Sequence, residues 1–374
     1  MKAFKLIPSI AEYNSFADYA EAACLGAQDL ILTNEYIYNP SISELNLGCQ
    51  TLFQEQYGAG EPTDVMVDAI LDELSTRCYD RIIAVGGGTI IDIAKVLSVA
   101  SNKDHVDDLY NRMPDGLSKV HPLVIVPTTC GTGSEVTNIA IINRTTKGVK
   151  QGIVSQAMFA DEAVLVTGML ESLPYGVFAT SSIDAMIHAV ESFLSPNACP
   201  ISEVFSEQAL AMILNGWKAA VTDSGKDAWK VYASDFLRAS NYAGIAFGYA
   251  GCAAVHALSY PLGSVHHIPH GQANQLMFAD VMRKYAEKQP VGKLNRLEEI
   301  LSGLLGVAQE DALQALYDLM NTVLARKPLK EIGVTEDELP VFAKNVVETQ
   351  QRLLNNNYVE LTEADILEIY QAAS

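Results

Sequence analysis

Cysteine is scarce in this sequence, and its few occurrences lie far apart. The 374 residues include six cysteines, and no two of them form a CxxC pair. A disulfide framework needs a denser set. The N-terminal stretch also lacks the apolar core of a signal peptide and soon becomes acidic, at Glu12. We therefore interpret the cysteines as ordinary thiols and expect a cytoplasmic protein.

Basic residues are also in short supply. The chain has 25 lysines and arginines against 45 aspartates and glutamates, which gives a formal net charge of −20. A surface of this sign repels the phosphates of nucleic acids and the headgroups of anionic lipids. We therefore expect no nucleic-acid partner and no membrane partner.

Charged residues are absent from one long stretch, residues 239–279, which has the length of a membrane span. Five glycines and two prolines interrupt it, so no run of strongly apolar residues is long enough for a membrane helix. The stretch also contains four histidines. We interpret it as an uncharged core segment that carries imidazoles.

The pattern of hydrophobic residues predicts two domains. Hydrophobic residues make up 49% of the chain, enough for a sizeable core. Short apolar runs at residues 29–33, 51–56, 81–85 and 123–126 alternate with helical patterns, as in a parallel sheet, and Thr63 can cap one of the helices. After Pro174, long helical periodicities follow at residues 177–193, 202–217, 229–246 and 294–324. The predicted fold class is an α/β domain with a parallel sheet over residues 1–174, followed by an all-α domain over residues 175–374.

Three glycines and a threonine follow the predicted strand at residues 81–85 and open a helix: Gly86, Gly87, Gly88 and Thr89. Backbone N–H groups without side chains can approach a phosphate closely, and the helix N-terminus adds about half a positive charge. The same pattern describes a tight strand-to-helix turn, and Thr89 and Asp92 have the spacing of a helix cap. Alone, this run leaves both interpretations open.

A second turn favours the phosphate-binding interpretation. Residues 127–135 follow another predicted strand and supply the hydroxyls of Thr128, Thr129 and Thr132. Two such turns at the carboxyl ends of parallel strands predict a dinucleotide site. Asn34 ends the first predicted strand, where an acid often holds the adenosine ribose; as a neutral residue it favours NAD over NADP only weakly, and a turn asparagine is the alternative.

Four residues in the second half have the chemistry of a metal site. Asp184 and His188 lie four residues apart, so both project from one face of a helix, although a hydrogen-bonded pair has the same spacing. His256 and His270 lie in the charge-free stretch, where imidazoles are costly unless something satisfies their nitrogens. We predict that the four bind one divalent metal ion; core histidines are the alternative. The set suits Fe²⁺, Zn²⁺, Mn²⁺ or Ni²⁺, which can lower the pKa of an alcohol.

Taken in order, these motifs resemble the iron-containing, group III alcohol dehydrogenases over essentially the whole length. Residues 86–95 are similar to the family's GGG[ST]xxDxxK, residues 127–135 to its PTTxGTxxE, and the four predicted ligands to its metal pattern. The resemblance implies a nucleotide-binding α/β domain, a helical metal-binding domain, NAD and Fe²⁺ as cofactors with Zn²⁺ the common substitute, and a homodimer. It also implies that Lys150, after a predicted hairpin, lies near the nicotinamide ribose and that Phe247 lines the substrate pocket.

Within that family the chain looks most similar to the members that oxidise 4-hydroxybutyrate, through residues 240–248, 256–263 and 356–362. The implied reaction interconverts 4-hydroxybutyrate and succinate semialdehyde. Two departures stand out: Tyr260 occupies a position where many members carry a second histidine, and Asn356, Asn357 and Tyr358 replace a common Asn-Pro-Arg. We hypothesise that His267 or Tyr260 assists proton exit, with packing as the alternative for Tyr260.

The substrate remains open at this point. A hydroxy acid needs a cation or several donors for its carboxylate, and the sequence does not choose among the candidates, which are Asn138, Arg144, Lys150, Arg238 and His266. The same chemistry on a diol, lactaldehyde or a simple primary alcohol is the nearest alternative. A lyase of the dehydroquinate synthase type and a non-catalytic metal- or nucleotide-binding protein are alternatives from other classes.

Overall fold

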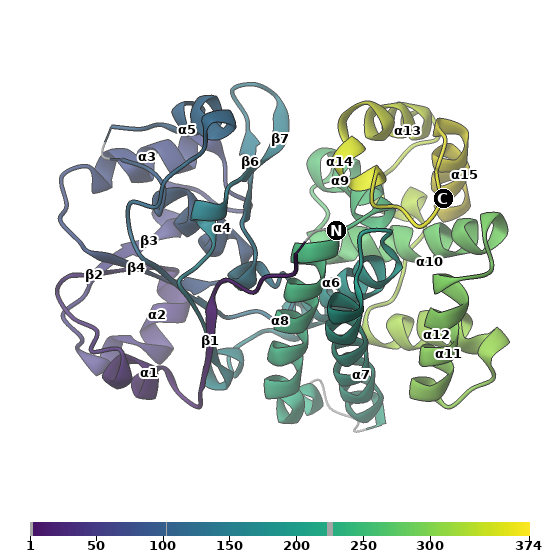
Figure 1. The fold of residues 1–374 in the computed structure, drawn as a ribbon, viewed down its shortest axis with the longest axis horizontal. Helices are drawn as coiled ribbons and strands as arrows, with labels where there is room; N and C mark the ends of the chain where they lie inside the picture. Colours follow the sequence, from purple (N-terminus) through teal and green to yellow (C-terminus); the bar gives the residue numbers. More distant parts are fainter. Residues whose placement is uncertain (1–2, 102, 223–226) are drawn as a thin grey trace. The chain divides into compact units, whose positions relative to one another are not determined.

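The computed structural model describes residues 3–101, 103–222 and 227–374. The chain forms two compact units (Figure 1). One spans Lys5–Leu173, and the other spans Pro174–Ser374 together with the start of the chain up to Phe4. The ring of Phe4 stacks on Phe205 and lies against Tyr249, which ties the start of the chain to the helices of the second unit.

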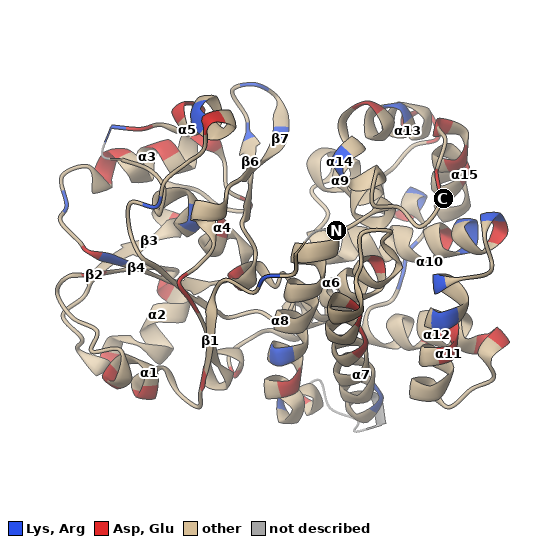
Figure 2. Ribbon diagram, viewed as in Figure 1, with Lys and Arg blue, Asp and Glu red and all other residues tan. Residues whose placement is uncertain are grey.

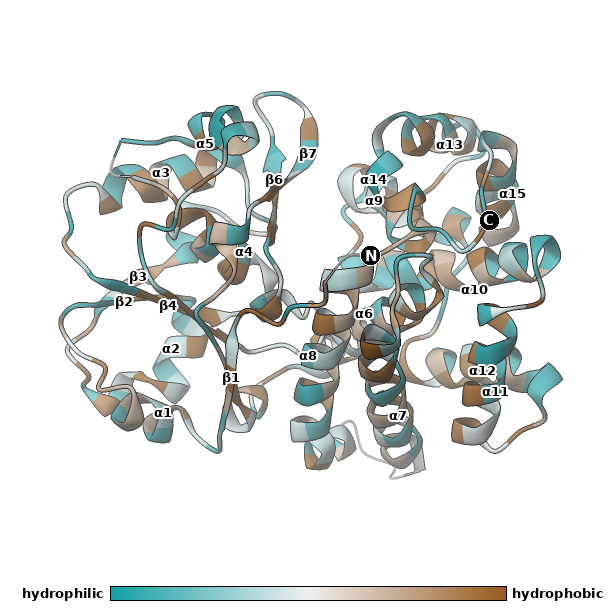
Figure 3. Ribbon diagram, viewed as in Figure 1, coloured by the Kyte–Doolittle hydropathy of each residue, from teal (hydrophilic) through white to brown (hydrophobic). Residues whose placement is uncertain are grey.

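The first unit is built on a six-stranded parallel sheet with strand order β1-β8-β5-β4-β2-β3. Its strands are β1 (Ser9–Tyr13), β2 (Asp29–Thr33), β3 (Gln50–Phe53), β4 (Arg81–Gly86), β5 (Leu123–Pro127) and β8 (Glu162–Val166). The strand predicted at residues 51–56 is shorter than expected, because the chain turns after Phe53 into the 3₁₀-helix η2 (Gln54–Tyr57). Strands β2 and β5 are buried over their whole length and are mostly hydrophobic (Figure 3), as expected where helices cover both faces.

Alternate residues of the sheet enter two separate cores. On β4, Ile82 and Ala84 join one cluster, whereas Ile83 and Val85 join the other. Helices α3 (Asp64–Leu74), α4 (Gly88–Leu97) and α5 (Val106–Arg112) pack on the first cluster, and α1 (Phe16–Ala22) and α2 (Glu35–Ser41) on the second. An antiparallel hairpin of β6 (Ile139–Arg144) and β7 (Val149–Val154) precedes β8. The unit is therefore an α/β layer structure with helices on both faces.

The described part of the second unit contains helices and no strand. Its α-helices are α6 (Tyr175–Leu194), α7 (Pro200–Thr222), α8 (Ala233–Ala250), α9 (Ala254–His266), α10 (His270–Lys288), α11 (Lys293–Leu305), α12 (Ala312–Val323), α13 (Glu338–Thr349), α14 (Gln351–Leu354) and α15 (Glu363–Ala373). The shorter 3₁₀-helices of the chain are η1 (Ser43–Leu45), η3 (Met113–Asp115), η4 (Ser134–Val136), η5 (Gln156–Met158), η6 (Thr167–Leu170), η7 (Ala228–Tyr232), η8 (Gln309–Asp311) and η9 (Leu329–Ile332).

The periodicity at residues 294–324 is not one helix but two, α11 and α12. Gly306 adopts a left-handed conformation, with φ +73°, and its N–H bonds the carbonyl of Ser302. A glycine in this conformation ends an α-helix at low cost because it has no Cβ. The break therefore comes from a C-terminal glycine inside a pattern that otherwise continues.

The charge-free stretch lies in α8, α9 and the start of α10, and α9 carries no acidic or basic residue other than histidine (Figure 2). Within the described ranges, a membrane span would need two helical pieces together, Ala228–Ala250 and Ala254–His266, with a bend of 106° between them; no helix qualifies by itself.

Candidate active site

The central helix of the second unit, α6, carries three ionisable side chains on one face. Asp184, His188 and Glu191 are spaced four and then three residues apart, which aligns them along an α-helix. All three are buried, with exposed fractions of 3%, 5% and 1%. Because buried carboxylates are costly unless they have a charged or hydrogen-bonding partner, this face needs partners from other helices.

Two further imidazoles reach this face from α9 and α10. His256 lies in the first turn of α9, and His270 is the first residue of α10. Helix α10 lies against α6 at Gly271, where a Cβ atom would come within 2.0 Å of the carbonyl oxygen of Thr180. The absence of a side chain at this glycine therefore lets α10 deliver His270 to the face of α6.

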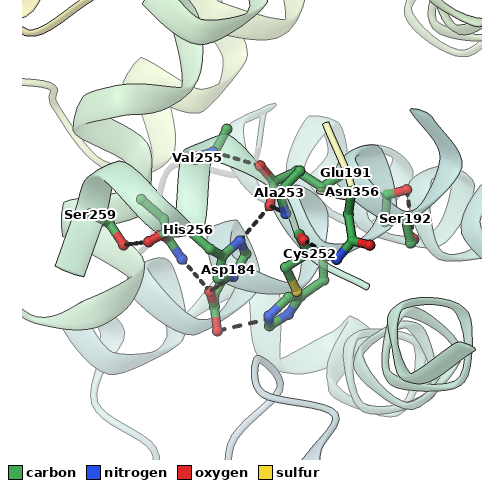
Figure 4. Close-up of polar contacts among 12 residues, drawn as sticks. Asp184, Glu191, Ser192, Cys252, Ala253, Val255, His256, Ser259 and Asn356 are labelled. Carbon is green, nitrogen blue, oxygen red and sulfur yellow. Dashed lines mark hydrogen bonds and ion pairs between the residues drawn. The ribbon is translucent and has the colours of Figure 1, made fainter. Parts of the chain in front are cut away.

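The four side chains that the sequence singled out lie close together. The Nε2 atoms of His256 and His270 each lie 3.6 Å from Oδ1 of Asp184. Nδ1 of His188 lies 3.9 Å from Oδ2 of Asp184, and its ring stacks on that of His256 with the centroids 4.6 Å apart. Figure 4 shows Asp184 and His256 facing each other within this cluster. The structure thus brings together all four predicted ligands.

The cluster fits a bound divalent cation. Nε2 of His256 is buried and has no hydrogen-bond partner among the described residues. Nδ1 of the same ring lies 2.6 Å from Oε2 of Glu191, so it carries the proton and leaves the Nε2 lone pair facing the cluster. A buried lone pair without a donor is costly, and a metal ion satisfies it. One carboxylate and three imidazoles are a donor set for Fe²⁺ or Zn²⁺.

Two side chains that support the cluster were missed in the sequence. Glu191 accepts hydrogen bonds from the N–H groups of Ala253 (2.9 Å) and Val255 (2.6 Å), in addition to its contact with His256. Asn274 donates its Nδ2 to Oδ1 of Asp184 at 2.7 Å. Their spacing could have indicated them, because Glu191 lies three residues after His188 and Asn274 lies four residues after His270, which places each pair on one face of a helix.

The charges in the cluster are mutually dependent. Burial opposes ionisation of Asp184, but His188, His270 and His256 together hold the pKa of this carboxyl well below its usual range. Burial likewise opposes protonation of His256, whereas Glu191 and Asp184 outweigh it and raise the pKa of this imidazole to about 9. A negative site built around Asp184 therefore attracts a cation, and a metal ion bound there would take the place of a second proton on His256.

In the first unit, the two predicted phosphate-binding turns lie side by side. β4 and β5 are neighbours, and Gly86 pairs with Pro127 at their carboxyl ends. A Cβ atom on Gly87 would lie 3.2 Å from the side chain of Thr129, and one on Gly88 would lie 3.1 Å from that of Thr132. Helix α4 starts at this point with no side chain capping its first N–H groups, which leaves them available to an anion.

The helix cap predicted from Thr89 and Asp92 is wrong. The N-cap of α4 is Gly87, and it makes no side-chain cap. The hydroxyl of Thr89 instead donates to the carbonyl of Gly60 at 3.1 Å. The carboxylate of Asp92 accepts from the N–H of Ile141 (2.9 Å) and the hydroxyl of Ser134 (3.2 Å). The side chains of Thr89 and Asp92 thus both bond to residues distant in the sequence, and Asp92 links α4 to the hairpin.

A buried lysine, which the sequence reasoning passed over, organises the second turn. Lys95 is fully buried on α4, and its ammonium group donates to Ser134 Oγ (2.7 Å), Thr137 Oγ1 (2.9 Å) and the carbonyl of Ile139 (2.9 Å). These three acceptors fix the chain between the threonine-rich turn and β6. Burial lowers the pKa of Lys95 to about 8, although the nearby carboxylates of Asp92 and Glu135 oppose the shift.

The low pKa of Lys95 makes stability depend on pH. Between pH 8 and pH 10.5 the folded chain has released the proton that the unfolded chain still holds, so the free energy of unfolding attributable to this group rises with pH across that window. Below pH 8 both states are protonated and the cost of burying the charge is constant. We expect the wild type to gain about 3 kcal/mol over Lys95→Met across the window, measured by urea unfolding at its two ends. A difference between the two proteins that does not change with pH would contradict this expectation.

The side chain of Asn34 is held by hydrogen bonds to residues that follow β2 and β3. The residue directly follows β2, and its Nδ2 donates to Gln54 Oε1 at 3.1 Å and to Glu55 Oε2 at 2.9 Å, while its Oδ1 accepts from the hydroxyl of Tyr36 at 3.2 Å. The carboxylate at this edge therefore comes from Glu55 after β3 and not from residue 34. The sequence reasoning missed Glu55, because the strand was expected to continue past it.

The family comparison covers nearly all of the chain. Residues 14–167 match the model described as iron-containing alcohol dehydrogenase, and residues 178–374 match that of the C-terminal part of the Fe-containing alcohol dehydrogenase family. The chain is 45% identical over 371 residues to 4-hydroxybutyrate dehydrogenase of Clostridium kluyveri, covering 99% of each protein. It is 34% identical to long-chain-alcohol dehydrogenase 1 of Geobacillus thermodenitrificans, covering 94% of this chain and 91% of that protein.

This chain belongs to the iron-containing alcohol dehydrogenase family. Solved structures with the same fold include sulfoacetaldehyde reductase from Bifidobacterium kashiwanohense, crystallised in complex with NAD⁺ (TM-score 0.85, 23% identity, 100% of this chain and 98% of that one). A 1,3-propanediol oxidoreductase superposes with a TM-score of 0.84 at 24% identity, covering all of both chains. At these identities the likeness supports the fold alone.

Membership in this family tests several of the predictions made from the sequence. The predicted fold class, a parallel α/β domain followed by a helical domain, is confirmed, as is the enzyme class. NAD and iron are the cofactors of this family, and a small-molecule alcohol is its substrate class. The lyase alternative is not favoured.

Among the residues expected near the substrate of this dehydrogenase, two lie against the cluster of Asp184, His188, His256 and His270. The ring of Phe247 stacks on His188 with the centroids 4.2 Å apart. The ring of Tyr260 lies 6.2 Å from that of His270. His267 instead ends α9 in a left-handed conformation, with φ +54° and an exposed side chain. Phe247 and Tyr260 therefore border the cluster.

Four of the five candidate carboxylate-binding residues already have protein partners for their side chains. The guanidinium groups of Arg144 and Arg238 pair with Asp107 and Asp235, and His266 pairs with Glu338 at 3.0 Å. Lys150 donates to both carboxylate oxygens of Glu61 at 2.8 Å and lies inside the hairpin on β7, not after it as predicted. Asn138, partly buried before β6, accepts from the N–H of Ser155 through its backbone carbonyl at 3.1 Å.

Proposed function

We propose that this protein interconverts 4-hydroxybutyrate and succinate semialdehyde, with hydride transfer between the carbinol carbon and NAD. The observation that carries the proposal is the 45% identity, over 99% of both chains, to the 4-hydroxybutyrate dehydrogenase of Clostridium kluyveri. A substrate preference is set by many pocket contacts, and this degree of identity over the whole length supports retention of that pocket more strongly than it supports the alternative alcohols.

We further propose that Asp184, His188, His256 and His270 hold the metal ion in the domain of residues 175–374. Their convergence supports this assignment, as does Nε2 of His256, which makes no hydrogen bond within the described residues and lies 3.6 Å from Oδ1 of Asp184. A divalent cation bound there acts as a Lewis acid toward an alcohol or carbonyl oxygen. Glu191 keeps the proton on Nδ1 of His256, and Asn274 holds Oδ1 of Asp184 in place.

The domain of residues 1–174 is proposed to bind NAD. Gly86, Gly87 and Gly88 permit close approach of the pyrophosphate to the start of α4, and the hydroxyls of Thr128, Thr129 and Thr132 and the side chains of Thr89 and Asp92 lie in or beside the two turns. Asn34 and Lys150 are proposed to contact the riboses. Asn34 is neutral and favours NAD over NADP only weakly. The carboxylate of Glu55, its hydrogen-bonded neighbour, also repels a 2′-phosphate and so favours NAD as well.

On the substrate side, Phe247 and Asn138 are proposed to border the substrate. Tyr260, beside His270, is the better candidate for proton exit, since the side chain of His267 is exposed at the end of α9. A cytoplasmic location and a homodimer complete the proposal; the scattered cysteines support the first and the family resemblance the second.

A comparison of substrates tests the reaction. With NAD and the metal-loaded enzyme, we expect NADH formation from 4-hydroxybutyrate with a kcat/KM at least ~10²-fold above that for 1-butanol or 1,3-propanediol, because a carboxylate paired in the pocket contributes about 3 kcal/mol. Equal values for the three alcohols would contradict the hydroxy-acid assignment while leaving the dehydrogenase class intact. Absence of net NADH with every alcohol would contradict the class as well.

A further inference from the structure

The turn between α8 and α9 brings a thiol to the metal cluster. The Sγ atom of Cys252 and one ring nitrogen each of His188 and His256 all lie within 4.8 Å of one another, and the three residues are buried. Figure 4 shows Cys252 near His256 and Asp184. A thiol and two imidazoles form a softer donor set than a carboxylate and three imidazoles.

The backbone around Cys252 is held by interactions that do not involve its sulfur. Gly251 has φ +85°, and a Cβ atom there would lie 2.3 Å from Nδ2 of Asn356, so the turn needs glycine. Asn356 donates to the carbonyl of Cys252 at 2.9 Å, and Glu191 accepts from the N–H of Ala253 at 2.9 Å. The sulfur is therefore positioned by the fold and remains available as a ligand.

A second observation points independently to a cation. Nε2 of His256 belongs to a side chain that is only 4% exposed, and this atom has no hydrogen-bond partner among the described residues. Because Glu191 takes the other ring nitrogen, the lone pair of Nε2 faces the cluster and not the supporting carboxylate. This Nε2 lies 3.6 Å from Oδ1 of Asp184, and one ring nitrogen of His256 lies within 4.8 Å of Sγ of Cys252, so His256 borders both donor groups.

We propose that His188, Cys252 and His256 form a second metal site, overlapping the first, for a soft thiophilic cation such as Cd²⁺. The donor atoms lie within 4.8 Å of one another. Zn²⁺ bonds of about 2.3 Å to sulfur and about 2.1 Å to nitrogen place tetrahedral donors about 3.5 Å apart, and the larger Cd²⁺ needs a wider spacing, so the donors need to close by at most about 1 Å. On binding, the S–H bond breaks, sulfur donates the electron pair to the cation, and the proton leaves to the buffer. No electron is transferred, and no co-reactant is consumed.

The proposal goes beyond the dehydrogenase reaction, since a thiophilic ion at this site uses two imidazoles of the first site without using Asp184 or His270. The two ions therefore exclude each other. Failure of the dehydrogenase assignment leaves this site intact, because its three donors depend only on the turn at Gly251 and on helices α6 and α9.

The experiment is a titration of the full-length protein with Cd²⁺ after dialysis against a chelator. The sulfur-to-cadmium charge-transfer absorption and the ¹¹³Cd resonance report thiolate binding directly. We expect the wild type and Cys130→Ser, a control at another buried cysteine, to show one more thiolate-bound equivalent of Cd²⁺ than Cys252→Ser. Asp184→Asn is expected to retain that equivalent. The exposed thiols of Cys24 and Cys78 contribute equally to all four proteins and cancel in the difference.

Two results would overturn the proposal. One is an unchanged cadmium–thiolate signal in Cys252→Ser; the other is loss of the signal in Asp184→Asn, which would show that the ion needs Asp184 and that His188, Cys252 and His256 do not form a site of their own. Thermal melting in the absence of metal checks that the variants are folded. If Cys252→Ser melts at a lower temperature, Cys252→Ala repeats the measurement with a side chain that brings no polar atom into the cluster.

Discussion

Replacing Asp184 by asparagine is expected to abolish iron binding and, with it, alcohol oxidation. The carboxylate is the one anionic group among the four proposed ligands, and two imidazoles lie 3.6 Å from its Oδ1. A Lewis acid stabilises the transition state by several kcal/mol, so its loss lowers kcat/KM for the alcohol by at least ~10³-fold. Elemental analysis of anaerobically purified protein is expected to give about one iron per wild-type chain and close to none for the variant.

Asp280→Asn provides a matched control for this prediction. Asp280 is as buried as Asp184 and lies on α10, but its carboxylate pairs with Arg283 and Arg326 and does not reach the cluster. This variant is expected to unfold at a lower temperature because it leaves two guanidinium groups without their partner, yet to retain its metal. Full metal content and activity in Asp184→Asn would refute the proposed metal site.

The substitution Gly271→Ala is expected to misplace His270 and to reduce kcat about 10²-fold, since a shift of about 1 Å at a reacting centre has an effect of this size. The added Cβ atom would lie 2.0 Å from the carbonyl oxygen of Thr180 and 2.7 Å from its carbonyl carbon. Both atoms belong to the backbone of α6, so no side chain can rotate away and the two helices must separate. Overpacking of this kind also costs about 1–3 kcal/mol of stability.

Gly303→Ala is the control for Gly271→Ala. Gly303 lies in α11, and a Cβ atom there meets no other atom within 4 Å. Alanine favours the helix over glycine, so this variant is expected to be at least as stable as the wild type and fully active. The two variants are compared by iron content, kcat and melting temperature. If Gly271→Ala matches Gly303→Ala in all three, the close approach of α10 to α6 has no role in the site.

The proposed metal ligands could be found in the sequence because their chemistry is unusual for its surroundings. His256 and His270 lie in a stretch without charged residues, and Asp184 and His188 have the spacing of one helix face. The glycine turn was equally visible, since it follows a buried strand directly. Local composition was therefore enough to identify the candidate residues, but it did not predict that they lie close together.

Residues that act through others were harder to find. Glu191, Asn274 and Lys95 are ordinary residues for a helix, and their roles follow from partners that are distant along the chain, such as Glu191 with His256. The boundary errors have the same origin: Gly306 ends α11 inside a continuous hydrophobic pattern, and Thr89 gives up its expected cap for the carbonyl of Gly60. In each case a long-range contact or a single backbone conformation outweighed the local pattern.

The amino-acid sequence by itself determined the alternation of strands and helices, the two turns of the first unit and the four residues able to bind a metal, because these depend on periodicity and side-chain chemistry. The tertiary structure decided which atoms meet. Only packing of α9 and α10 on α6 turns Nε2 of His256 toward Asp184, gives its Nδ1 to Glu191 and sets Cys252 beside it. The reason is that distances between separate helices depend on contacts such as that of Gly271 with Thr180, which no local pattern encodes.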